Sequence, residues 1–174
     1  MTQADVRVEV LDPESVDAHA DLIAAIYVAS MGFSDDAGRR LVERIEKSPA
    51  LVIGAFEDAE LVGFLFGFQL RESNWWVQQI APHLPDGHDY YRNSFELNEL
   101  MVDPSKQGRG IGRQLLEKLH ETTNYDHFLL GARKDNVNAR KLYERLGYRV
   151  IVDDFQYAAA NEIHVIMAKS RVQG

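Results

Sequence analysis

The stretch QGRGIG, residues 107–112, places three glycines in five positions between two segments of contrasting character. The preceding residues, SFELNELMV (94–102), are typical of a strand, and an Asp-Pro pair ends them. The following residues, GIGRQLLEKLH (110–120), carry apolar side chains four positions apart, which predicts an amphipathic helix. Any fold of this chain must therefore accommodate a strand, a glycine-rich turn and a helix N-terminus in direct succession.

The glycine spacing excludes the two common nucleotide-binding loops. No GxxxxGK[ST] sequence is present, and the glycines at 108, 110 and 112 are followed by Arg113 instead of meeting the GxGxxG pattern. The following strand, residues 127–133, also ends without the carboxylate that the dinucleotide-binding pattern requires. Unpaired amides at a helix N-terminus still favour an anion, and Lys106, Arg109 and Arg113 add positive charge. The residues alone leave two alternatives, an anion site and a plain turn that starts a helix.

Hydrophobic periodicity predicts the remaining elements and an α/β sandwich of mixed sheet direction. EDAE (57–60) separates two apolar runs and indicates a hairpin, whereas residues 71–94 are less regular and hold both tryptophans. We expect helices over residues 16–30, 35–47, 76–80, 110–120 and 138–146, and strands over 7–11, 50–56, 61–70, 94–102, 127–133, 148–154 and 162–169.

Length and composition indicate one globular domain over residues 1–174. The formal net charge of −8 argues against nucleic acid as a partner and is compatible with a cationic small molecule. The chain has no cysteine, which excludes disulfides, thiolate metal sites and a cysteine nucleophile. The first residues do not resemble a signal peptide, and no apolar run is long enough for a bilayer span, so we expect a cytoplasmic protein without membrane contact.

Two sequence blocks resemble the GNAT superfamily of acyl-CoA-dependent N-acetyltransferases. QGRGIG matches its [QR]xxGx[GA] signature, within LMVDPSKQGRGIGRQLLEKL (100–119), which is similar to the family's strand, pyrophosphate loop and helix. NVNARKLYERLGYRV (136–150) resembles the family's later helix and strand. The two blocks lie about 25 residues apart with one strand between them, as the family requires, and a lone glycine motif would be a much weaker match.

The resemblance implies a GNAT-type α/β sandwich. Its central sheet is mixed and mostly antiparallel, with splayed parallel fourth and fifth strands (here 95–102 and 127–133) and helices on both faces. It also implies acetyl-CoA as cosubstrate, with the pantetheine arm against the backbone of the fourth strand and the pyrophosphate on the loop amides. The implied cofactor-binding residues are Leu100, Met101, Val102, Gln107, Gly108, Arg109, Gly110, Ile111, Gly112, Arg113 and Asn138.

Acetyl transfer to an amine needs a proton acceptor, because alkyl amines titrate near about 10.4 and only the neutral form attacks. By resemblance, Glu96 occupies the position of the base in histone-type members, and Glu99 is the alternative on the same strand. Other open alternatives are a loop residue or a water chain. Tyr143 occupies the position of the family's acid, which protonates the departing thiolate; otherwise it is a core tyrosine.

These features predict an enzyme that transfers acetyl from acetyl-CoA to a primary amine by direct attack in a ternary complex. The alternatives are a catalytically silent acyl-CoA sensor and a transferase of longer acyl groups. The acceptor is either a small-molecule amine or an amine of a protein or peptide, and the acidic balance mildly favours a cationic one. We propose no metal, since His83 and His88 lack a convincing ligand spacing. Whether the chain forms a homodimer stays open.

Overall fold

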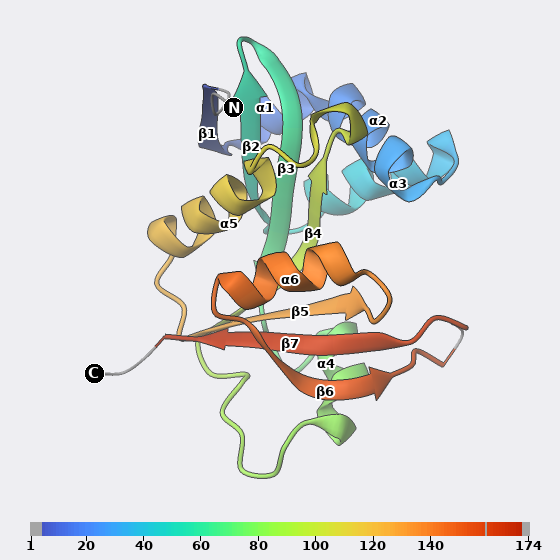
Figure 1. Cartoon of the computed structure of the whole chain (residues 1–174), viewed down its shortest axis with the longest axis vertical. Helices are drawn as coiled ribbons and strands as arrows, with labels where there is room; N and C mark the ends of the chain where they lie inside the picture. Colours follow the sequence, from blue (N-terminus) through green and yellow to red (C-terminus); the bar gives the residue numbers. More distant parts are fainter. Residues whose placement is uncertain (1–4, 159, 172–174) are drawn as a thin grey trace. The chain divides into compact units, whose positions relative to one another are not determined.

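The computed structural model describes residues 5–158 and 160–171, and the chain divides into two compact units. The first unit runs to Phe68 and includes Asn98–Asn124; the second comprises Gln69–Leu97 and the chain from Tyr125 onward. The elements in the described residues (Figure 1) are β1 (Val6–Leu11), α1 (Pro13–Ala18), α2 (Ala20–Met31), α3 (Asp35–Glu46), β2 (Leu51–Glu57), β3 (Glu60–Gln69), α4 (Trp75–Ile80), η1 (Ala81–His83), β4 (Ser94–Val102), η2 (Pro104–Lys106), α5 (Ile111–Thr122), β5 (His127–Arg133), α6 (Val137–Arg145), β6 (Arg149–Phe155) and β7 (His164–Ser170).

The described strands are hydrogen-bonded in the order β1-β2-β3-β4-β5-β7-β6. Pairs β1–β2, β2–β3, β5–β7 and β6–β7 are antiparallel. Strands β4 and β5 are parallel, with Ser94–Glu96 opposite His127–Leu129. The predicted mixed, mostly antiparallel sheet with parallel fourth and fifth strands is therefore confirmed, and so is the mixed α/β class.

The first unit has helices on both faces of its strands. Phe64, Phe66 and Met101 belong to the core cluster that also holds the buried side chains of α1, α2 and α3. Gly63, which directly precedes Phe64, faces α5, because a Cβ there would stand 3.4 Å from the side chains of Ile111 and Leu115. Coverage on two faces explains why β2 and β3 are apolar runs with few polar interruptions, instead of alternating sequences.

The second unit packs α4 against β5, β6 and β7. Figure 1 shows α4 behind β6 and β7, and α6 next to β5. Trp76 and Ile80 of α4 share a core cluster with Leu129 and Ile166, whereas Trp75, next in sequence to Trp76, is 65% exposed. One of the two tryptophans is therefore a core residue and the other lies on the surface.

The helix expected over residues 16–30 is divided in two at His19. Asp12 caps α1 by accepting a hydrogen bond from the Ser15 amide, and Pro13 occupies the first turn. His19 then leaves helical geometry, with φ −110° and ψ 12°, and α2 begins at Ala20. The expectation of one helix was wrong because apolar spacing continues across the break. The other predicted helices and strands are found with ends that differ by two residues or fewer.

No helix in the described ranges combines the length and the apolar character that crossing a membrane requires.

Candidate active site

The glycine loop occupies the connection between β4 and α5 in the first unit. Gly108 and Gly110 have φ of 76° and 80°, in the left-handed region that side chains with a Cβ rarely adopt. A Cβ at either position would meet no other atom within 4 Å, so the space above the loop is open. Gly110 is the N-cap of α5, and its carbonyl accepts from the amide of Gln114. The loop thus presents the N-terminal amides of a 12-residue helix to open space, an arrangement that suits an anion.

Three hydrogen bonds fix the end of β4 next to this loop. The Val102 carbonyl accepts from the Ser30 hydroxyl at 3.1 Å and from the Gln107 side-chain amide at 3.2 Å. The amide of Asp103 donates to the Val62 carbonyl at 2.9 Å. Gln107, the first residue of the glycine signature, therefore ties the loop back to the strand that precedes it.

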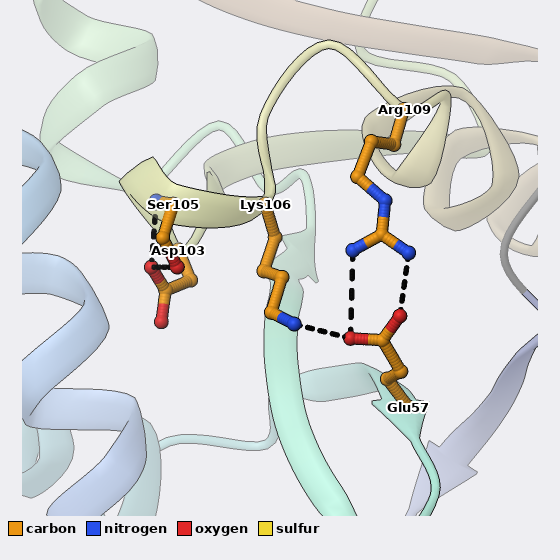
Figure 2. A network of polar contacts seen from close by, with 5 residues as sticks. All are labelled: Glu57, Asp103, Ser105, Lys106 and Arg109. Atoms are coloured by element: carbon orange, nitrogen blue, oxygen red, sulfur yellow. Dashed lines mark hydrogen bonds and ion pairs between the residues drawn. The ribbon is translucent and has the colours of Figure 1, made fainter. Parts of the chain in front are cut away.

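The turn that follows β4 is built on Asp103. Its carboxylate accepts from the amide of Ser105 at 2.8 Å and from the Ser105 hydroxyl at 2.7 Å (Figure 2). These two hydrogen bonds lower the pKa of Asp103, so the carboxylate stays ionised and keeps the turn closed at neutral pH. Asp103 and Pro104 thus end the strand for the local reasons that the sequence suggested.

Two cations beside the loop converge on one carboxylate, Glu57 at the end of β2 (Figure 2). Arg109 reaches both oxygens of Glu57, at 2.5 Å and 3.4 Å, and the Lys106 ammonium reaches it at 2.5 Å. The Arg109 and Lys106 hydrogen bonds lower the pKa of Glu57 from 4.5 to about 2. Arg113 pairs with Glu117 one turn along α5. The positive charge expected around the turn is therefore partly compensated, and the helix amides carry more of the attraction for an anion.

The two candidate carboxylates of β4 lie in different units. Glu99 is 3.9 Å from the guanidinium of Arg44 on α3, and the same guanidinium donates to the Asn98 side chain at 3.0 Å. Asn98 and Glu99, adjacent on the strand, thus share one partner, which strict alternation of faces does not predict. Glu96 is 7% exposed within the second unit, where its charge adds to the burial that raises the pKa of Tyr157.

Helix α6 of the second unit carries the other two predicted site residues. Asn136 caps the helix by accepting from the Ala139 amide at 3.2 Å, and Asn138 is exposed in the first turn. Tyr143 is 9% exposed and its ring lies 5.7 Å from that of Tyr148. Burial is the main cause that raises the pKa of Tyr148 well above its usual range. The side chain of Tyr143 is therefore largely excluded from solvent and lies near a second tyrosine ring.

The first unit brings together most of the predicted cofactor-binding residues. Leu100, Met101 and Val102 form the end of β4, and Gln107 through Arg113 form the loop and the first turn of α5. Glu99 is on the same stretch of β4, whereas Glu96, Asn138 and Tyr143 belong to the second unit. Sequence patterns do not identify Glu57, Ser30 or Arg44 as parts of this site. Only Glu57 lies in a recognisable motif, the acidic run EDAE, and that run indicates a hairpin turn.

No group of three or more acidic or histidine side chains in the described ranges lies close enough together to hold a metal ion.

Comparisons with known proteins agree with this architecture. The model of the acetyltransferase (GNAT) family matches residues 20–148. The aminoglycoside 6'-acetyltransferase type Ii has a solved structure that superposes with a TM-score of 0.70 at 18% identity, covering 97% of this chain and 99% of that one. The PaiA N-acetyltransferase from Thermoplasma acidophilum, solved with coenzyme A, gives 0.63 at 17% identity, covering 96% and 99%. The chain belongs to the GNAT family of acetyltransferases.

Among curated sequences, a GCN5-like protein acetyltransferase of Mycobacterium tuberculosis is 28% identical over 124 residues, which cover 65% of this chain and 60% of that protein. The chain spans about half the length of the curated relatives it matches. The likeness to the solved structures, below 20% identity, concerns the fold alone.

Proposed function

We propose that this chain is an N-acetyltransferase that transfers acetyl from acetyl-CoA to a primary amine by direct attack in a ternary complex. The observation that carries the proposal is the loop between β4 and α5, in which two left-handed glycines leave the first amides of α5 facing open space. The coenzyme A in the solved relative from Thermoplasma acidophilum supports an acyl-CoA as the matching cosubstrate.

The loop would hold the pyrophosphate through the amides from Gly108 to Arg113, at the positive end of the α5 dipole. Glu57 holds Lys106 and Arg109 beside the loop and cancels part of their charge, so the amides would carry most of the attraction for the pyrophosphate. The backbone of residues 100–102 would meet the pantetheine arm, and the role of Asn138 in binding that arm stays a prediction of the family resemblance.

The chemistry needs a neutral amine and a proton for the leaving thiolate. Acetyl-CoA supplies the acetyl group as a thioester, which the amine attacks directly. A carboxylate of β4, Glu96 or Glu99, accepts the amine proton directly or through water, and Tyr143 donates a proton to the thiolate. The chain contains no cysteine, and no serine in a GxSxG turn, that would form an acetyl-enzyme intermediate.

Residues 1–174 would form one N-acetyltransferase domain, which the family match supports because it runs through parts of both compact units. A primary amine of a small molecule or of a protein or peptide is the acceptor. The cytoplasmic location stays a prediction from sequence.

Replacing Tyr143 tests the mechanism. We expect Tyr143→Phe to lower kcat by about 10- to 100-fold, within or just below the usual contribution of general acids, with little change in acetyl-CoA affinity. Tyr148→Phe is the matched control, since it removes a hydroxyl from the neighbouring ring. Initial rates of amine acetylation and calorimetric titration of acetyl-CoA measure the two effects. Unchanged turnover in Tyr143→Phe would remove this residue from the mechanism.

A further inference from the structure

The first unit contains a cavity of about 510 Å³ between α2 and α3, which lie side by side in Figure 1. This volume is within the range of small-molecule sites. The residues that line it are Tyr27, Phe33, Ser34, Ala37, Arg40, Leu41 and Arg44.

The polar wall of this cavity consists of hydrogen-bond donors and positive charge. Arg40 and Arg44 are one turn apart on α3, so both side chains lie on the same face of the helix. Burial, followed by the charge of Glu99, raises the pKa of Tyr27, which keeps its hydroxyl protonated and able to donate. None of the described residues that line the cavity carries a carboxylate. The charged side chains that line the cavity are thus both cationic, and their carboxylate partners, Asp36 and Glu99, are not among the lining residues.

Arg40 is placed to exchange its present partner for a ligand. It pairs with Asp36, one turn earlier on the same helix, and its side chain is 66% exposed. Ion pairs in such positions contribute little free energy, so a carboxylate entering the cavity competes with Asp36 at small cost. Guanidinium groups bind carboxylates in a planar, two-pronged geometry.

Arg44 connects the cavity to the proposed site of acetyl transfer. Its guanidinium donates to Asn98 and lies 3.9 Å from Glu99, both on the half of β4 that leads into the glycine loop. Arg44 also lies over the ring of Phe66, 5.7 Å from its centroid. The cavity therefore opens beside a strand whose backbone and carboxylate already have roles in the proposed function.

The apolar part of the wall is aromatic. Tyr27 and Phe33 meet edge to face with ring centroids 5.7 Å apart, and Ala37 and Leu41 extend the apolar surface along α3. Phe33 is 47% exposed, a large apolar side chain at the cavity that is left available for contact.

We propose that this cavity binds the acyl acceptor, and that the acceptor is a small amino carboxylic acid with an apolar or aromatic side chain. The inference rests on the proposed function, because the acceptor amine has to reach β4. The carboxylate is held by Arg40 and Arg44, the side chain packs on Tyr27 and Phe33, and the amine lies toward Glu99.

The test uses three probes that differ in the group next to the amine: phenylalanine, phenylalaninamide and phenethylamine. We expect kcat/KM for phenylalanine to exceed both others by about 10-fold or more, since a charge-assisted hydrogen bond contributes about that much. Arg40→Gln removes this preference through KM, with kcat retained. Arg39→Gln is the matched control, because Arg39 also pairs with Asp36 on α3 but does not line the cavity.

A binding measurement separates this inference from the proposed function. Phenylalanine is titrated into the protein while the amide resonances of Ala37 and Leu41 are followed by NMR. Shifts that disappear in Arg40→Gln and persist in Arg39→Gln support the cavity even if no amine is acetylated. If kcat/KM is the same for the three probes in wild type and in Arg40→Gln, the inference is wrong, whereas the proposed transferase activity is supported. Acetylation of acidic peptides alone, without free amino acids, also overturns it.

Discussion

Glu57 shows at the scale of single residues how much the glycine loop depends on a distant carboxylate. It lies 49 residues before Lys106 and 52 before Arg109, yet it contacts both. Long-range ion pairs of this kind leave no local pattern in the sequence. The sequence therefore indicated the loop and its three nearby cations, but not the carboxylate that orders two of them.

The Glu57 ion pairs predict a specific dependence of stability on pH. Because the folded pKa of Glu57 is about 2, below its ordinary 4.5, its contribution is present above about pH 4.5 and is lost as pH falls toward 2. Near pH 6 the urea concentration at the midpoint of unfolding should be higher for wild type than for Glu57→Gln. This difference between the two midpoints should disappear toward pH 2. Glu60→Gln, which removes a carboxylate across the same turn, is the matched control. A wild-type to Glu57→Gln gap of equal size at pH 6 and pH 2 would contradict the assignment.

At the scale of elements, sequence periodicity located the strands and most of the helices, because each buries a face with regular spacing. It did not locate the break at His19, where the apolar pattern of α1 and α2 runs on while the backbone turns. The cavity could not be predicted from the sequence either. Arg40 and Arg44 have the spacing of ordinary solvent-facing helix residues, and only the packing of α2 beside α3 makes them line a cavity. Sequence spacing predicts faces of elements, whereas a cavity depends on which faces meet.

The loop element is tested by two substitutions at Gly110 that differ only in charge. Asn and Asp both tolerate the left-handed backbone better than other residues, and they have nearly the same size. We expect Gly110→Asn to keep most of the acetyl-CoA affinity and Gly110→Asp to bind at least about 10-fold more weakly than Gly110→Asn, because of like charge near the pyrophosphate. Calorimetric titration measures both. Equal affinities for the two variants would mean that the loop does not hold the pyrophosphate.

At the scale of the whole molecule, family membership is established by a match that covers residues 20–148. The fold class and the loop could be predicted from the two sequence motifs, whereas the proposed acceptor could not, because the side chains proposed to bind it lie outside both motifs. The acidic net charge mildly favours a cationic acceptor and stays a prediction, whereas the cavity of the first unit is lined by two guanidinium groups, on which the proposed amino acid acceptor rests.

The most direct test of the central claim is an acetyl-CoA consumption screen across amine classes, with release of free CoA measured and the acetylated product identified by mass spectrometry. The account predicts CoA release that depends on a primary amine, with amino carboxylic acids among the best acceptors. Tight binding of acetyl-CoA without CoA release for any amine class would contradict it and would identify the chain as an acyl-CoA-binding sensor.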